Sequence, residues 1–547
     1  MNPPGPIRRL AALFFAYAAV ALAVYAPALH GAFVSDDVGY VLWNPWVHAI
    51  NAENLLAILA PTGPAAAYTA NYAPVHLLLH ALDWQCFGAD TLGHHVVNVV
   101  LHALASALVA ALLARSGLSF AAAAAGGALF LVHPANVEAV AWIFQLKTVA
   151  ALALACGALL AEPRRPLLAT ALFGLALLTK IQAAFALPVA LVWIWLERPD
   201  SPRSRRVRFA WLGAWAALLA LAWMPEFLAF ERLGHADVSA AASAPERVRT
   251  MLALLGRYFA MAATSYGVSA FQQPMPPRSW LDPWCLIGAL GAAALAGRAL
   301  LALWRRDEEA AWWVWAAGGF LPVSQLLPFL YPMADRYLYY VLPGLIGGLG
   351  FAARRALSGR ASAAPPSWQR FAVVLALGVL GAFAWRSVGR ADVWRSEATL
   401  TLDAVRHYPN GLQGNLLRAQ SAARRGDAEA AAEALRAASA LGFDRFMDIE
   451  RNPLYADVRS DPRFAAAVRD VAGRWIAVVE RRANPTVPEL SMLGQAHAVR
   501  GEWDLAAQYL ERAVAGGGPG SDAAREQLAA LRAQERAERA AHGAPAP

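Results

Sequence analysis

The feature that most constrains this chain is a series of long apolar runs separated by short, arginine-bearing segments. Runs of about 18–22 residues are long enough to cross the hydrocarbon core of a bilayer as helices. Only 16% of the residues are charged, whereas soluble domains carry about 25%. The first run, Leu10–Leu29, is longer than the apolar core of a signal peptide, which favours a retained span. The pattern predicts an all-α, polytopic membrane helix bundle.

About eleven spans are predicted from these runs. Arginines cluster in alternate loops, and the positive-inside rule makes that side cytoplasmic. The net charge of +8 therefore reflects membrane topology, and we expect no nucleic-acid partner. Two long loops, 31–94 and 230–282, then lie outside, as does the C-terminal region. The predicted spans cover residues 10–30, 95–114, 119–132, 148–161, 166–179, 182–196, 209–229, 283–304, 311–329, 337–352 and 370–386.

The composition changes to alanine-, arginine- and glutamate-rich and soluble after about residue 387. Two pairs of apolar helical segments are each joined by a turn of glycine plus an acid, at Gly426 and Gly501, which is typical of tetratricopeptide repeats. Such an array offers a concave face to a partner, and a plain helical domain without a ligand is the alternative. The predicted domains are a membrane domain at 1–387, a repeat-like helical domain at 388–535 and a disordered tail at 536–547.

An acidic pair, Asp36 and Asp37, follows the first predicted span and lies at the outer mouth of the bundle. Holding charge at a membrane edge is costly, so a pair placed there calls for a reason. A general base that waits for a hydroxyl group arriving from outside is one reason. Capping of an interfacial helix is the alternative.

Lysine is almost absent from this chain. Of 47 basic residues only Lys147 and Lys180 are lysines, and both fall at the outer ends of predicted spans, where the positive-inside rule disfavours them. A lipid phosphate at the outer leaflet is a natural partner for two compact cations. The alternative is that both side chains extend to the lipid headgroups.

A polar face opens the second predicted span. His95, Asn98 and His102 are spaced i, i+3 and i+7, so they share one side of a helix that we expect to point into the bundle. Hydrogen bonding between helices and contact with a substrate are both consistent with that face. A metal site is a third alternative, and the sequence does not identify the residues that would bind the ion.

Two further polar clusters lie on the predicted outer side. His133 and Glu138 follow the third span, where Glu138 either orients an acceptor or pairs with Lys147. Asp335, Arg336 and Tyr337 occupy a short outer turn. Arg336 is suited to bidentate phosphate binding, and a loop-fixing pair with Asp335 is the alternative.

The three cysteines do not form a disulfide framework. Cys86 and Cys285 are both predicted near the outer surface, which leaves a bridge between them open. No Cys/His spacing typical of a zinc site is present.

Five short motifs, in this order, resemble those of the bacterial relatives of transmembrane-and-tetratricopeptide-repeat O-mannosyltransferases, in the GT-C superfamily of polyprenyl-phosphate-sugar-dependent glycosyltransferases. The resemblance extends over nearly the whole chain. Two departures are the stretch Asn71–Val75, which lacks the usual arginine, and Leu146-Lys147-Thr148, which replaces an Arg-Lys-Asp run. The motifs are Asp36-Asp37 with Asn44-Pro45, His95–His102, Val132–Trp142, Thr179-Lys180 with Pro188, and Met333–Tyr339.

The resemblance implies transfer of a sugar, mannose or another hexose, from a polyprenyl monophosphate to a hydroxyl acceptor, with inversion. The acceptor would be a protein serine or threonine, or a glycan, docked by the repeat domain. Asp36 would be the base, Asp37 would orient it or bind a divalent cation, and Lys147, Lys180 and Arg336 would hold the phosphate. The polar clusters would bind or orient substrate. The implied location is a bacterial inner membrane, with the site and the C-terminal domain facing the periplasm.

Two other functions are compatible with parts of the pattern. A non-catalytic, membrane-anchored repeat scaffold for protein–protein interaction would fit the missing first-loop arginine. A transporter would require polar residues near mid-membrane and inverted repeats, whereas the polar residues here lie at the outer ends of spans. The retained aspartates and lysines favour the transferase.

Overall fold

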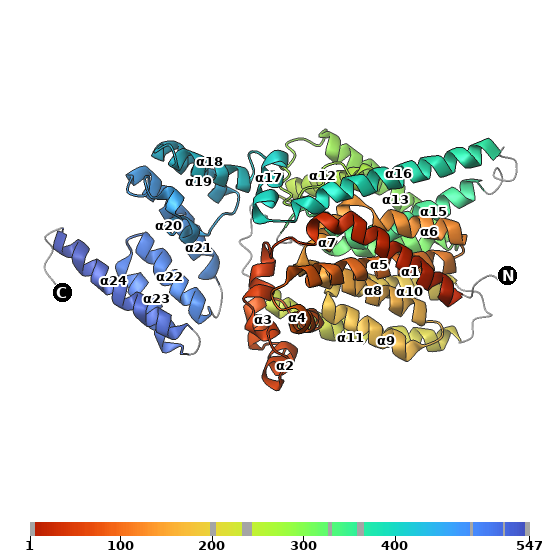
Figure 1. Ribbon diagram of the computed structural model, residues 1–547, viewed down its shortest axis with the longest axis horizontal. Helices are drawn as coiled ribbons and strands as arrows, with labels where there is room; N and C mark the ends of the chain where they lie inside the picture. Colours follow the sequence, from red (N-terminus) through yellow and green to blue (C-terminus); the bar gives the residue numbers. More distant parts are fainter. Residues whose placement is uncertain are drawn as a thin grey trace. The chain divides into compact units, whose positions relative to one another are not determined.

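Every regular element that the structure describes is a helix, as the sequence patterns predict (Figure 1). The computed structural model divides into two compact units. Unit 1 comprises Met1–Phe230 and Ser243–Asp403, and unit 2 comprises Glu231–Ala242 and Ala404–Pro547. The described residues are 6–196, 204–231, 243–326, 331–357, 366–481, 485–517 and 520–541.

Six helical stretches among the described residues of unit 1 are long and apolar enough to cross a bilayer. The shortest has 19 residues, which is about 28 Å of helix at 1.5 Å per residue. These stretches make the chain a multi-pass membrane protein. They run through α1 (Pro6–Tyr25), α5 (Thr91–Arg115), η5 with α8 (Ile143–Ala161), α11 (Arg205–Glu231), α13 (Pro283–Trp304) and α16 (Pro366–Val393).

The other apolar helices of unit 1 are shorter or bent. α6 (Phe120–Leu131) joins the stretch Pro134–Ala141 at an angle of 52°, so this pair is one broken span or a re-entrant segment. α9 (Pro166–Thr179) has 14 residues, about 21 Å, which is too short for a straight crossing. The described residues therefore contain six spans, or seven with the bent pair, and the predicted eleven are not confirmed. Part of the predicted span 311–329 lies outside the described residues.

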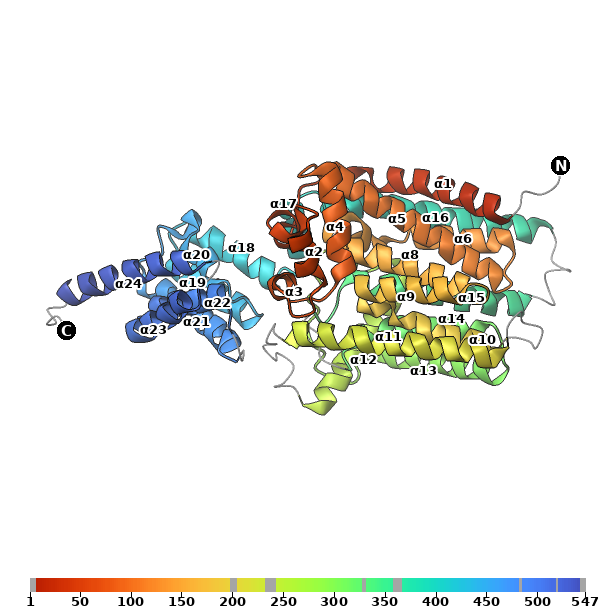
Figure 2. The same ribbon diagram turned by 90° about the horizontal axis from the view of Figure 1, so that it is seen from below.

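α5 is the helix around which the first half of unit 1 is packed. It lies beside α1, α6 and α8 (Figure 2). A second close contact joins α14 (Glu309–Phe320) to α15 (Leu342–Leu357). A Cβ on Gly344 would lie 2.3 Å from the Ala316 backbone nitrogen, so only glycine permits this approach.

Three short helices occupy the long loop between α1 and α5. α4 starts with a proline in its first turn, where the missing N–H costs nothing. It ends at Gly88, whose φ of +55° reverses the chain toward α5. The loop helices are α2 (Ala52–Leu59), α3 (Pro64–Thr69) and α4 (Pro74–Phe87).

Unit 2 consists of helices that pack on their neighbours in sequence. The two predicted turns are present, and both Gly426 and Gly501 adopt a left-handed backbone, with φ of +71° and +77°. α24 continues to Ala541, so the start of the segment predicted to be disordered is helical, and residues 542–547 lie outside the described residues. The main helices are α18 (Leu412–Ala423), α19 (Ala428–Ala440), α21 (Pro462–Val479), α22 (Val487–Val499), α23 (Trp503–Ala515) and α24 (Ser521–Ala541).

The cysteines are all free thiols, and Cys156 and Cys285 are buried. The bridge between Cys86 and Cys285 that the sequence left open is therefore not formed.

Candidate functional site

The predicted site residues come from segments that meet at one end of unit 1, where α1 ends and α5 begins. The segment around α7 (Val137–Ala141) contacts α5, α8 and the 3₁₀ turn η8 (Asp335–Tyr340). The end of α9 reaches the same place through a side-chain hydrogen bond to α8. The structure thus brings together motifs that are up to three hundred residues apart in sequence.

Asp37 is a buried clamp between two of these segments. Its carboxylate accepts the backbone N–H of Val34 at 3.0 Å and that of Phe144 at 2.6 Å. Burial is the main cause of a pKa well above the usual range for this carboxyl group, and the two hydrogen bonds act in the opposite direction. Trp142 adds a parallel link, because its indole N–H donates to the Val34 carbonyl at 3.3 Å. Asp37 therefore fixes the loop after α1 against the turn before α8.

Asp36 is exposed, in contrast to its neighbour. The residue before it, Ser35, has a φ of +53°, and its backbone N–H donates to the carboxylate of Glu397. Asp36 follows this left-handed residue and is exposed, whereas Asp37 is buried. The carboxylate of Asp36 acts electrostatically on Tyr40 and Lys147. The exposed acid therefore acts electrostatically on one of the two lysines.

Lys147 and Lys180 lie at this end of α8 and α9. The Lys147 ammonium lies 3.9 Å from the centre of the Phe144 ring, and its side chain is buried. The Lys180 ammonium donates to the Thr148 hydroxyl at 2.7 Å and lies 5.7 Å from the Tyr340 ring centre. Within the described ranges, neither ammonium has a carboxylate oxygen within 4.0 Å.

Arg336 is the third cation of the site, and Glu138 holds it. The Glu138 carboxylate accepts the Arg336 backbone N–H at 2.7 Å and also pairs with its guanidinium. The guanidinium lies 5.5 Å from the Trp142 ring centre. Arg336 interacts electrostatically with both lysines. The pair expected between Glu138 and Lys147 is therefore replaced by a pair with Arg336.

Asp335 and Tyr337 lie on either side of Arg336 in sequence. Both side chains make hydrogen bonds that hold other segments in place. Asp335 is buried and accepts the Ser269 backbone N–H at 2.9 Å and the Gln272 amide at 2.6 Å. Burial raises its pKa well above the usual range. The Tyr337 hydroxyl donates to the Tyr331 carbonyl at 3.1 Å. Asp335 thus anchors the loop before α13 and is not the partner of Arg336.

The polar face of α5 is buried, as its spacing predicts. The Asn98 amide donates to the carbonyls of Trp142, at 3.0 Å, and of Val140 and Ile143, at 3.3 Å each. Both ring nitrogens of His102 are occupied, by the Tyr339 hydroxyl at 2.8 Å and the Leu131 carbonyl at 3.0 Å. His95 is buried on the same face. The hydrogen bonds of Asn98 and His102 link α5 to neighbouring segments of the bundle.

His133 also makes structural contacts. One ring nitrogen accepts the Ala135 backbone N–H at 3.2 Å, which caps a 3₁₀ turn, and the other bonds the Ala262 carbonyl at 3.0 Å. The side chain is buried, with 1% exposed. It ties the bend between α6 and α7 to α12 (Ala244–Thr264).

Glu226 is a site residue that the sequence analysis missed. Its carboxylate accepts the Tyr72 backbone N–H at 2.7 Å and interacts electrostatically with both lysines. Tyr72 lies in the stretch that lacks the usual arginine. The sequence contained a signal for Glu226, because an acidic residue inside an apolar span is rare and usually functional. Glu226 thus acts electrostatically on the two lysines and joins α11 to the loop between α1 and α5.

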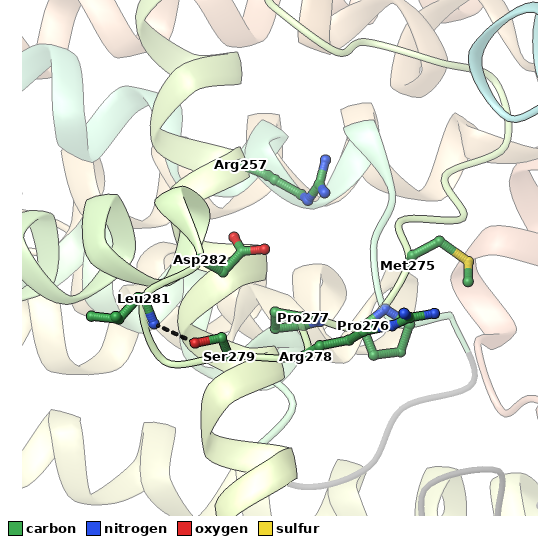
Figure 3. Close-up of a pocket in the computed structure, with 8 residues that line it drawn as sticks. All are labelled: Arg257, Met275, Pro276, Pro277, Arg278, Ser279, Leu281 and Asp282. Atoms are coloured by element: carbon green, nitrogen blue, oxygen red, sulfur yellow. Dashed lines mark hydrogen bonds between the residues drawn. The ribbon is translucent and has the colours of Figure 1, made fainter.

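A surface pocket lies elsewhere in unit 1 (Figure 3). Its volume is about 430 Å³, and it lies between α12 and the start of α13. Arg257 of α12 and Asp282, the N-cap of α13, lie on its walls, with the loop from Met275 to Leu281 between them. None of the predicted site residues lines it.

The chain is similar to the protein O-mannosyl-transferase Tmtc1 of Drosophila melanogaster, with 37% identity over 130 residues. The similarity covers 22% of this chain and 15% of that protein, so the chain matches only a small part of the relative's length. No family model and no solved structure matches the chain. The matched part supports a relation to O-mannosyl-transferases of this type.

Proposed function

We propose that this protein is a membrane-embedded glycosyltransferase. It transfers a sugar, mannose or another hexose, from a polyprenyl monophosphate to a hydroxyl group of a protein or glycan acceptor. The proposal includes a GT-C type of bundle with about eleven spans, in a bacterial inner membrane with the site facing the periplasm. The partial similarity to Tmtc1 supports the transferase class. The cluster of three cations at one end of unit 1 is the observation that carries it.

The three cations suit a phosphate that gains charge during the reaction. Lys147, Lys180 and Arg336 act on one another electrostatically, and only Arg336 has a directly paired carboxylate among the described residues. Like charges gathered in a poorly solvated place destabilise the fold unless an anion joins them. The donor's phosphodiester carries one negative charge, and the polyprenyl phosphate that leaves carries two. Cations fixed in advance stabilise that added charge.

Asp36 is the proposed base. The acceptor oxygen attacks the anomeric carbon while the bond from that carbon to the phosphate oxygen breaks, and the attack from the opposite face inverts the configuration. The acceptor proton passes to the Asp36 carboxylate. Its exposure and its electrostatic interaction with Lys147 support this role. Asp37 is proposed as a positioning residue, since both of its oxygens hold backbone N–H groups.

The remaining predicted residues are proposed to shape the site. Glu138 fixes Arg336, and Asn98 fixes the turn before α8, so both act through other groups. Unit 2, with its two glycine turns, is proposed as a repeat-like platform on which the acceptor docks. The positioning residues of this set are His95, Asn98, His102, His133, Glu138, Asp335 and Tyr337.

Transfer by the purified protein tests the proposal. A panel of radiolabelled polyprenyl-phosphate sugars would be supplied with periplasmic extract to wild type and to Asp36→Asn. We expect transfer from one donor and a loss of at least about 100-fold in Asp36→Asn. Glu53→Gln removes an exposed carboxylate of the same loop and should leave transfer unchanged. Full transfer by a folded Asp36→Asn would contradict the proposed base, and no transfer from any donor would favour the non-catalytic scaffold.

A further inference from the structure

A second polar cluster lies between α4 and the start of α5. Among the described residues, the side chains of His80, Asp83 and His94 bring one ligating atom each within 4.8 Å of one another. His80 and Asp83 are three residues apart on one face of α4, and His94 follows the turn at Gly88. The cluster is distinct from the Asp36 site and does not depend on the function proposed for it.

The polar atoms of this cluster are buried without partners. His80, His94 and Asp83 have 0%, 1% and 8% of their surface exposed. In the part of the chain that the structure describes, no hydrogen bond reaches either ring nitrogen of His80, Oδ2 of Asp83 or Nδ1 of His94. A buried polar atom left unpaired destabilises the fold, so several in one place call for a ligand.

The direction of the lone pairs identifies the kind of ligand. The Nε2 of His94 lies 3.0 Å from the Gly88 carbonyl, which can only accept, so this nitrogen carries the proton. Nδ1 of the neutral ring therefore presents a lone pair. It faces Oδ2 of Asp83 at 3.8 Å, which is beyond hydrogen-bond range. Two lone-pair acceptors that face each other across this gap form a place suited to a cation.

We propose that His80, Asp83 and His94 bind a divalent transition-metal ion of the zinc type. Two imidazoles and a carboxylate are ligands that Zn²⁺ accepts, at about 2.0–2.2 Å. One ligand atom from each of the three side chains lies within 4.8 Å of the other two, close enough for one ion to be shared among them. The Gly88 carbonyl would act as the outer partner that orients the His94 ring. The fourth position of a tetrahedron would be left to water.

The ion would be a structural link between the outer loop and the second span. It would join α4 to α5 on both sides of the turn at Gly88. One turn before His80, His76 bonds the Phe144 carbonyl at 3.1 Å, and the rings of His76 and His80 are 4.6 Å apart. The ion would therefore also hold α4 against the turn that precedes α8.

Metal binding by the full-length protein tests this site. The protein would be purified in detergent through a tag without histidine, stripped with a chelator and titrated with Co²⁺ and Zn²⁺. We expect one ion per chain, the visible absorption of tetrahedral Co²⁺, and a higher unfolding temperature with Zn²⁺. His80→Ala and His94→Ala should each weaken binding at least about 100-fold. His30→Ala changes an exposed histidine outside the cluster and should bind as wild type.

A variant of nearly unchanged shape guards against misfolding. Asp83→Asn keeps the size of the side chain while removing its charge, and we expect binding at least about 10-fold weaker in a protein that still folds. Absence of one bound ion in wild type, or equal affinity in wild type, His94→Ala and Asp83→Asn, would overturn the proposal.

Discussion

The two units of this chain treat their carboxylates in opposite ways. In unit 1, Asp37, Glu138 and Asp335 are buried and hold backbone or guanidinium groups of distant segments. In unit 2, carboxylates such as Glu429 lie at the surface and pair with arginines such as Arg463. Burying a carboxylate is costly unless it is fully bonded, whereas a surface pair contributes little. Unit 1 therefore uses these buried carboxylates to fix the arrangement of its loops, whereas the carboxylates of unit 2 named here stay at the surface.

The largest expected effect separates these two kinds of pair. Glu138→Gln removes the charge that holds Arg336 and leaves a buried guanidinium uncompensated, so we expect a loss of about 3–5 kcal/mol in the free energy of unfolding. The matched change in unit 2, Glu429→Gln, should alter that free energy by less than about 1 kcal/mol. Denaturant unfolding of both variants in detergent measures the contrast. Equal losses in the free energy of unfolding of the two variants would contradict the contrast between the two units.

A smaller effect is expected from Asp37→Ala. The change leaves the Val34 and Phe144 N–H groups unpaired and should cost about 1–3 kcal/mol. Because burial raises the Asp37 pKa, the folded state holds its proton more tightly than the unfolded state, and the stability that Asp37 supplies falls as pH rises above about 3.9. The cost of Asp37→Ala should thus be larger at pH 4 than at pH 7. A cost that grows toward pH 7 would argue against this account.

The smallest expected effect on stability comes from Asp461, and its pH dependence should be opposite to that of Asp37. In unit 2, hydrogen bonds from Arg463 lower the Asp461 pKa to about 2, so the stability that Asp461 supplies is present above about pH 3.9 and is lost as pH falls through 2. Asp461→Asn should speed amide hydrogen exchange in α21 slightly at pH 5. At pH 2 the variant and wild type should exchange alike. A difference that persists at pH 2 would contradict the assigned cause.

The two glycine turns of unit 2 and the long apolar helices were predictable because their signals are local. The turns at Gly426 and Gly501 and the apolar run of α5 are visible within a short stretch of sequence, and each element is present where its pattern lies. The span count was less predictable, since short runs such as α9 carry the same composition as a full span but too little length. Apolar composition alone does not distinguish a crossing helix from a buried or re-entrant one.

The burial of the candidate residues was predictable in part, but their contacts were not. The spacing of His95, Asn98 and His102 identified a buried face, yet the carbonyls that Asn98 bonds belong to a turn more than forty residues away. The partner of Glu138 is almost two hundred residues away, so sequence spacing suggested the wrong cation. Motif searches for zinc spacing likewise missed the His80, Asp83 and His94 cluster, because one ligand lies across a chain reversal.

Binding of a labelled polyprenyl monophosphate tests the central claim most directly, because the cation cluster carries the proposed function. The account predicts that the double variant Lys147→Met/Lys180→Met, if folded, binds this lipid at least about 10-fold more weakly than wild type. Arg463→Met, a cation of unit 2, should bind as wild type. Equal binding by the double variant and wild type would contradict the assignment of the lysines to the donor phosphate.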